Sequence, residues 1–237
     1  MNNVSHTGRV FVTGDTHGEI DLFKLSSKGF PDGKTLTRDD YVIIAGDFGV
    51  LWSNRPDSTE KYLLAWLAAK PWTTLFIDGN HENFTRLQDL PSVEMFGNKV
   101  GVVNDTTFHL RRGEVYTIAG KRIFCFGGAK STDRAYRIEG KTWWPEEEPN
   151  YIETDYGLQS LEQVGYEVDY IITHNGPATI IKMMNLLWSG VNDDPICKYF
   201  DHVISATKFR GYFFGHHHAD VEQGKFRCLY KNIVELI

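Results

Sequence analysis

Chemically reactive side chains recur in one setting in this sequence, directly after short apolar stretches. Aspartate, asparagine and histidine follow such stretches at five points, in the segments Gly14-Asp15-Thr16-His17-Gly18, Gly46-Asp47, Gly79-Asn80-His81-Glu82, Thr173-His174 and Gly215-His216-His217-His218. Carboxylate oxygens and imidazole nitrogens together suit borderline divalent metals such as manganese, iron and zinc. Each segment alone also fits an ordinary turn, but their recurrence favours one shared metal site.

The spacing within two of these segments favours convergence on one ion. Asp15 and His17 are two residues apart, as are His216 and His218. Residues i and i+2 of an extended segment point to the same side, so we expect each pair to face one way. Four histidines lack such placement and are interpreted as ordinary surface or packing residues: His6, His109, His202 and His217.

The elements that must position these groups are short strands and the helices between them. Apolar runs predict strands at 9–13, 41–45, 73–77, 106–111, 114–118, 122–126, 168–173 and 212–214, with further strand material in 226–237. Helical patterns and caps predict helices at 19–28, 57–69, 83–90, 158–164, 178–187 and 196–209. Because α/β sheets place their sites at the carboxyl ends of strands, we expect the reactive groups to meet at that edge.

Residues 129–156 are interpreted as a long surface excursion from a single domain that spans residues 1–237. Long excursions in compact domains are commonly functional. This one carries Arg134 and Arg137, whose forked donors suit phosphate oxygens, and Trp143 and Trp144, which suit stacking on a base or an apolar leaving group. The alternative is an inert loop, in which the tryptophans anchor the chain and the acidic residues 146–148 pair with the arginines.

Composition limits the class of protein. The chain has 237 residues, of which 41% are hydrophobic and 24% charged, as is typical of a soluble folded protein. Its net charge of −6 argues against extended nucleic-acid binding, but it permits a small phosphoester substrate because bound metal can outweigh the global sign. The three cysteines form no Cys-x-x-Cys pair, which suits a reducing compartment. No signal peptide or membrane span is visible, so we expect a cytoplasmic protein.

The order of the motifs, Gly-Asp-x-His, Gly-Asp, Gly-Asn-His-Glu, Thr-His and Gly-His-x-His, resembles that of the calcineurin-like metallophosphoesterase family. The resemblance extends from Gly14 to His218 and implies an α/β fold, a four-layer α/β/β/α sandwich with the site at the strand ends. It implies two divalent metal ions, among Mn, Fe, Zn, Ni and Co, with Mn favoured. It also implies that His81 contacts the substrate phosphate or protonates the leaving group. The implied ligands are Asp15, His17 and His218 for one ion, Asn80, His174 and His216 for the other, and Asp47 for both.

These residues predict metal-dependent hydrolysis of a phosphoester by a metal-bridging hydroxide. Two divalent ions outweigh the charges of Asp15, Asp47 and the hydroxide, and the remaining positive charge attracts the substrate. Two metals about 3.5–4 Å apart lower the pKa of a bound water to about 7. General-acid help from His81 is typically worth roughly 10²–10⁴-fold. The expected substrate is a small phosphodiester, phosphomonoester or nucleotide.

Two alternatives are weighed against this prediction. Relatives that dephosphorylate Ser/Thr proteins have Val-Asp-Arg-Gly after Gly-Asp, with an arginine that helps to bind phosphate. This chain has Phe48-Gly49-Val50-Leu51-Trp52 there, which disfavours a protein phosphatase. The other alternative is a non-catalytic metal-binding scaffold of the same fold. Such scaffolds usually lose ligands or the acid, whereas all eight positions are intact here.

Overall fold

The computed structural model describes residues 8–186 and 194–237. The strands are β1 (Val10–Thr13), β2 (Tyr41–Ala45), β3 (Thr73–Ile77), β4 (Ser92–Met95), β5 (Asn98–Asn104), β6 (Thr107–Leu110), β7 (Glu114–Ile118), β8 (Lys121–Phe126), β9 (Tyr170–Thr173), β10 (Gly211–Phe214), β11 (Val221–Gln223), β12 (Phe226–Cys228) and β13 (Ile233–Glu235). The α-helices are α1 (Ser58–Ala68), α2 (Phe84–Gln88), α3 (Tyr151–Gln163), α4 (Ala178–Met183) and α5 (Pro195–Ala206). Short 3₁₀ helices are η1 (Leu22–Leu25), η2 (Pro31–Thr35), η3 (Arg134–Tyr136) and η4 (Pro145–Glu147).

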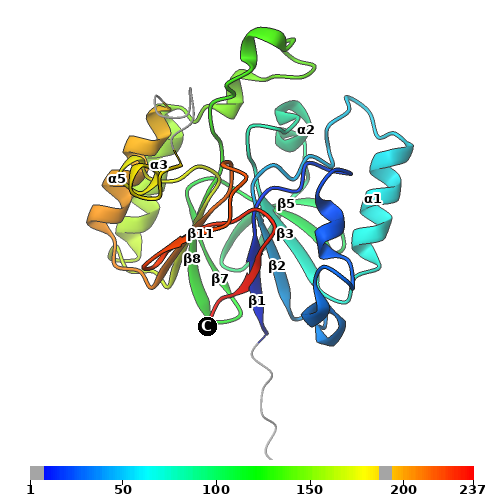
Figure 1. Cartoon of the computed structure of the whole chain (residues 1–237), viewed down its shortest axis with the longest axis horizontal. Helices are drawn as coiled ribbons and strands as arrows, with labels where there is room; N and C mark the ends of the chain where they lie inside the picture. The colour runs from blue at the N-terminus through cyan, green and yellow to red at the C-terminus, as the bar shows by residue number, and fades with distance from the viewer. Residues whose placement is uncertain (1–7, 187–193) are drawn as a thin grey trace, which may run out of the picture.

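Two mixed sheets face each other, and helices cover both outer surfaces (Figure 1). The seven-stranded sheet has the order β13-β1-β2-β3-β6-β5-β4, and the six-stranded sheet has the order β11-β12-β10-β9-β8-β7. Helices α1 and α2 lie on one side, and α3 and α5 lie on the other. The predicted four-layer α/β/β/α sandwich is therefore confirmed.

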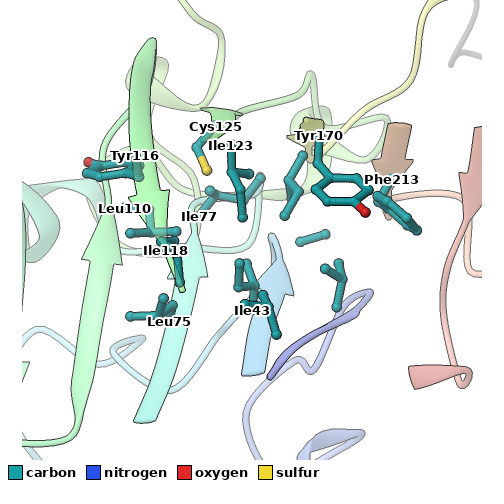
Figure 2. Packing of buried hydrophobic residues seen from close by; sticks show 14 of the residues in the cluster. Ile43, Leu75, Ile77, Leu110, Tyr116, Ile118, Ile123, Cys125, Tyr170 and Phe213 are labelled. Carbon is teal, nitrogen blue, oxygen red and sulfur yellow. The ribbon is translucent and has the colours of Figure 1, made fainter. Parts of the chain in front are cut away.

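The central core lies between the sheets. Figure 2 shows Ile43 and Leu75 of the seven-stranded sheet in one cluster with Ile123, Tyr170 and Phe213 of the six-stranded sheet. Two further clusters fill the spaces under the helices, one against each outer sheet face. Because both faces of the central strands are covered, these strands are continuously apolar rather than alternating in polarity.

Parallel pairing brings the site-bearing strand ends to one edge. Strands β1, β2 and β3 are mutually parallel neighbours, and so are β9 and β10 in the other sheet. The two edges meet directly, since Nδ1 of His174, just after β9, lies 3.0 Å from the carbonyl oxygen of Ala45 at the end of β2. All five reactive segments therefore lie at one end of the sandwich.

Several predicted elements need correction. The helix predicted at 19–28 is reduced to η1, because Lys24 and Asp21 are held by contacts with the β1 loop and the chain turns beneath it. Helix α3 begins at Tyr151 and not near 158, since Asn150 and Glu153 form a capping box, so the excursion ends at residue 150. The predicted end of the helix at Leu187, and also His6, lie outside the described residues.

The carboxyl-terminal segment is divided between the two sheets. Strand β12 pairs with β10 and β11 in the six-stranded sheet, whereas β13 pairs antiparallel with β1 in the seven-stranded sheet. The strand material predicted in 226–237 is therefore confirmed as β12 and β13. Among the described helices, none combines the length and apolar character needed to cross a membrane.

Candidate metal centre

The chain bends sharply where the site-bearing strands end. His17, Asp47, His216 and His218 have φ angles of 41°, 48°, 66° and 48°, in the left-handed region that non-glycine residues rarely adopt. The predicted extended geometry was therefore wrong. Asp15 and His17 still converge, but His216 lies beside His174 while His218 lies beside His17. Strained backbone of this kind clusters at functional sites.

Glycines at two strand ends allow carboxylates to approach the neighbouring backbone. A Cβ atom at Gly79 would lie 2.0 Å from Oδ1 of Asp47, and one at Gly215 would lie 2.1 Å from Oδ1 of Asp15. Backbone amides shortly after these glycines hold the same oxygens, since the N–H of His81 donates to Asp47 at 2.8 Å and that of His216 donates to Asp15 at 2.9 Å. The position of each carboxylate is thus set by a different strand from its own.

One group of predicted ligands converges closely. A ligand atom from each of Asp15, His17, Asp47 and His218 lies within 4.8 Å of the others. Nε2 of His17 lies 3.2 Å from Oδ2 of Asp47, and Nε2 of His218 lies 3.1 Å from Oδ2 of Asp15. This arrangement offers two carboxylates and two imidazoles to one point.

The second group meets the other oxygen of Asp47. Nε2 of His174 lies 3.3 Å from Oδ1 of Asp47 and 3.1 Å from Oδ1 of Asn80. The His174 and His216 rings have centroids 5.0 Å apart. Because Oδ2 of Asp47 faces His17 and Oδ1 faces His174, this carboxylate lies between the two groups.

The donor chemistry of the second group fits a cation. The carbonyl of Ala45 accepts from Nδ1 of His174, so Nε2 is the ring nitrogen that faces Asn80 and Asp47. The Asn80 amide donates to Oγ of Ser131, so its oxygen is the atom that faces His174. Nε2 of His174, Oδ1 of Asn80 and Oδ1 of Asp47 thus converge on one point. In the neutral tautomer with its proton on Nδ1, all three atoms offer lone pairs, a set that suits a divalent cation.

The first group fits a cation for a related reason. Oδ2 of Asp15 is fully buried and, within the described ranges, makes no hydrogen bond of suitable geometry despite the nearby His218 ring. Burial would lower the pKa of His17, but Asp47 and Asp15 outweigh burial and raise this pKa to about 9. The carboxylates therefore stabilise a positive charge at His17, and the same negative potential would attract a divalent ion.

Burial has the opposite outcome at His216. Burial lowers the pKa of His216 well below its usual value, and the neighbouring His174 acts in the same direction. Burial would raise the pKa of Asp47, but the imidazoles of His174, His81 and His17 outweigh it and hold that pKa well below its usual range. The site thus presents an ionised carboxylate next to an uncharged imidazole, the forms in which both bind metal.

Buried and half-buried groups behind these residues fix their orientation, and the sequence analysis did not identify them. Asp21 lies 2.9 Å from Nδ1 of His17, four residues along the chain, a spacing that was visible in the sequence. Glu82 accepts from the backbone amide of Phe48 at 2.6 Å and holds the loop after Asp47. Lys24 donates to the carbonyls of Gly14, Asp15 and Tyr230 beneath the β1 loop. Such outer contacts hold and tune metal ligands.

The excursion supplies the support for Asn80. Oγ of Ser131, which accepts from the Asn80 amide, donates to Oε2 of the fully buried Glu147 at 2.7 Å, and the Ser131 amide donates to Oε1 at 2.8 Å. No spacing in the sequence joins Ser131 or Glu147 to Asn80. Residues of the excursion thus contact a predicted ligand, which speaks against the inert-loop alternative.

The two excursion arginines differ in position. Nη2 of Arg137 lies 3.2 Å from Nε2 of His81, and the guanidinium is held by Asp133 at 2.7 Å. Arg134 instead stacks 3.8 Å above the Trp143 ring and pairs with Glu148 at 3.0 Å, away from His81. The structure brings only Arg137 to the candidate site.

The excursion tryptophans are anchors rather than binding surfaces. Trp143 is 5% exposed and Trp144 is 4% exposed, so neither offers a face to a substrate. Trp144 instead packs edge-on against Trp52, with ring centroids 5.7 Å apart. The anchoring role left open by the sequence is the observed one.

His81 stands at the edge of the two ligand groups. Its ring is stacked with Trp52, with centroids 6.2 Å apart and planes at 30°. Burial lowers the pKa of His81, and the charge of Arg137 acts in the same direction against Asp47. A cavity of about 160 Å³ opens beside it, lined also by Asp47, Asn80 and His218. The ring therefore faces the space between the two ligand groups.

The packing interpretation of the other histidines is supported where they are described. Nε2 of His109 contacts Asp78 at 3.2 Å, and Nε2 of His217 contacts Asn175 at 3.1 Å, both in the interior. Asp78 is also held by Arg112 at 2.8 Å, which ties the end of β3 to the segment before β7. This buried ion pair was not foreseen, since its partners are 34 residues apart.

Comparison with known proteins agrees with this geometry. The family model for calcineurin-like phosphoesterase matches residues 8–220. The chain is 27% identical over 192 residues to a lariat debranching enzyme from Danio rerio, a match that covers 73% of this chain and 32% of that protein. Thus the chain spans about a third of that relative's length.

A solved structure of phosphopantetheinyl hydrolase from Mycobacterium tuberculosis is also similar. The TM-score is 0.49 at 14% sequence identity, over 94% of this chain and 88% of that chain. The family match covers the whole span of strand-end motifs, from Gly14 to His218. This chain belongs to the calcineurin-like phosphoesterase family.

Proposed function

We propose that this protein is a dinuclear metal-dependent phosphoesterase that hydrolyses a small phosphodiester, phosphomonoester or nucleotide. The observation that carries the proposal is the convergence of two groups of ligand atoms on the two oxygens of Asp47, with His81 beside them. Asp15, His17 and His218 would hold one ion, Asn80, His174 and His216 would hold the second, and Asp47 would contact both. Among Mn, Fe, Zn, Ni and Co, we favour Mn, since the donors are mixed oxygen and nitrogen atoms.

Two such ions, when bound, acidify water and neutralise charge on the phosphoryl oxygens. The protein supplies positioning and the proton. In the reaction, a water that has given one proton to solvent forms a bond from its oxygen to phosphorus, and the bond from phosphorus to the leaving oxygen breaks. The electron pair of the broken bond stays on the leaving oxygen, which would take a proton from His81 in its protonated form to complete the alcohol, and His81 would then regain a proton from solvent.

Arg137 is the proposed substrate-binding arginine. Its guanidinium is held in place by Asp133, and Nη2 is the amino group that faces His81. A phosphoryl oxygen placed between the ligand groups and His81 would lie within reach of this donor, and charge-assisted bonds to such oxygens are strong. Arg134 is proposed to stabilise the excursion, since its guanidinium pairs with Glu148 and stacks on the ring of Trp143.

A non-catalytic scaffold is the weaker reading. A scaffold needs no acid next to its ligands, whereas His81 is present, stacked on Trp52 and adjoined by Arg137. The matched relative's name concerns lariat debranching, and we do not extend that substrate to this chain, whose net charge is −6.

The test is a panel of phosphoesters assayed after chelation and after repletion with manganese. The panel contains matched monoesters, diesters and nucleotides that release the same chromophore. We expect turnover of at least one class with metal and none without it. Metal-loaded protein that hydrolyses none of them would refute the enzyme and leave the scaffold.

A further inference from the structure

A groove begins at His81 and runs away from the ligand groups. His81 lines both the 160 Å³ cavity beside Asp47 and a separate cavity of about 410 Å³ bounded by the β1 loop, the β2 loop and α1. That larger cavity shares Glu19, Thr59 and Leu63 with a third one of about 270 Å³. We call the second and third cavities together the α1 groove.

The walls of the α1 groove are largely apolar, and those farthest from His81 are exposed. Trp52 forms the wall next to His81, with Val50 and Leu63 behind it. Farther along, Ile20 is 75% exposed and Tyr62 is 60% exposed, although both are large and apolar. Contiguous exposed apolar surface next to a site commonly marks a binding groove.

The charges of the groove restrict its occupant. Glu19 and Asp57 lie on the wall, and the third carboxylate, Glu60, is buried and paired with Arg86 at 2.7 Å. Among the described residues, none that lines the groove is a lysine or an arginine. Beyond His17, at the metal-site end, an anionic occupant would meet the carboxylates of Glu19 and Asp57 and no lysine or arginine, whereas an uncharged occupant would not be repelled.

Given the proposed hydrolysis at His81, we infer that the α1 groove binds the leaving group of the substrate, and that this leaving group is an uncharged aromatic alcohol. The phosphoryl group would lie on the Asp47 side of His81, and the leaving oxygen would face His81. The attached ring would then lie in the groove against Trp52. The groove thereby selects among phosphoesters that the metal centre alone would treat alike.

The first test measures binding without turnover. The probes are two methyl arylmethylphosphonates, one with a neutral acetyl group on the ring and one with a sulfonate. In both, a methylene group replaces the ester oxygen between phosphorus and the ring, so the ring cannot be released. Calorimetry on the manganese-loaded protein should show tighter binding of the neutral probe, by roughly 5-fold, because the ring contact is common to both probes and only the sulfonate is repelled by Glu19 and Asp57. Equal affinity, or tighter binding of the sulfonate, would overturn the inference.

The second test uses variants and the matching methyl aryl phosphodiesters, chosen for similar phenol acidity. Trp52→Ala should abolish the preference in kcat/KM for the neutral ester, and Glu19→Lys should reverse it in favour of the sulfonate. Tyr151→Ala removes an aromatic ring that is 80% exposed on α3, far from the groove, and should leave the ratio unchanged. A ratio that survives both groove variants would overturn the inference.

Three other outcomes are separated by this design. If Trp52 only supports His81 through stacking, Trp52→Ala will slow both esters equally and leave their ratio intact, which counts against the inference. If the neutral probe binds preferentially but no phosphoester is hydrolysed, the proposed hydrolysis fails while the groove specificity stands. If esters are hydrolysed without any preference, the inference alone fails.

Discussion

Nη2 of Arg137 lies 3.2 Å from Nε2 of His81, although the two residues are 56 positions apart in the chain. The contact joins the excursion to the end of β3 and places a guanidinium beside the proposed acid. Asp133 fixes that guanidinium from the other side at 2.7 Å. The excursion therefore lies in direct contact with the candidate site.

Arg137→Ala should raise KM for the phosphoester by roughly 10-fold, because a charge-assisted bond contributes about 1.5–3 kcal/mol. Arg134→Ala is the matched control, since Arg134 is half exposed and pairs with Glu148. It should leave KM within about 2-fold, because exposed pairs contribute little. Steady-state kinetics on both variants gives the comparison. Equal KM values would remove Arg137 from substrate binding.

Chelation should abolish activity and lower the melting temperature, and manganese should restore both. The physical reason is that an ion held by the converging atoms of His174, Asn80 and Asp47 binds the folded chain, in which these strand ends meet, and thereby stabilises it over the unfolded chain. Calorimetric scans of the protein with chelator and with added manganese measure the shift. Full activity in protein shown by elemental analysis to be metal-free would contradict the proposed mechanism.

Asp47→Asn and His81→Ala should separate metal binding from chemistry. Asp47→Asn should lose both metal and activity, because a neutral amide is a poor bridge between two cations. His81→Ala should keep its metal while kcat falls by roughly 10²–10⁴-fold, the usual contribution of a general acid. Elemental analysis gives the metal content of each variant, and steady-state kinetics gives its kcat. Loss of an ion in His81→Ala would instead make His81 a ligand.

Arg112→Met should destabilise the fold by about 3–5 kcal/mol, because it leaves Asp78 as a buried charge without its main partner. Arg210→Met is the control, since that side chain is 72% exposed and lies 3.3 Å from Asp169. The control should change the free energy of unfolding by less than about 1 kcal/mol. Urea unfolding of both variants measures the difference, and similar values would contradict the prediction.

Acid should weaken the fold partly through the same aspartate. Burial would raise the pKa of Asp78, but Arg112 and His109 outweigh burial and lower this pKa from 3.8 to about 2. Because the pKa of Asp78 is lower in the folded than in the unfolded chain, ionised Asp78 stabilises the folded state by roughly 2 kcal/mol above pH 3.8. This stabilisation is lost as the pH falls towards 2. The difference in unfolding free energy between wild type and Asp78→Asn should therefore shrink across this range. A difference that stays constant from pH 5 to about 2 would exclude this role.

The sequence alone determined the fold class and the candidate ligands. Continuous apolar runs specify strands buried on both faces, and each run ends in residues whose chemistry suits a metal. The strand from 73 to 77 and the cap of α1 at Asp57 were located correctly for this reason, since their signals are local. The order of motifs then indicated the family to which the chain belongs.

Only the tertiary structure decided how these residues meet and what surrounds them. Asp47 faces two ligand groups because left-handed turns, and not extended segments, follow the strands. The link from Glu147 through Ser131 to Asn80 and the contact of Arg137 with His81 join segments that no local pattern relates. Such contacts depend on where the excursion folds back over the strand ends, a long-range property that spacing along a chain does not encode.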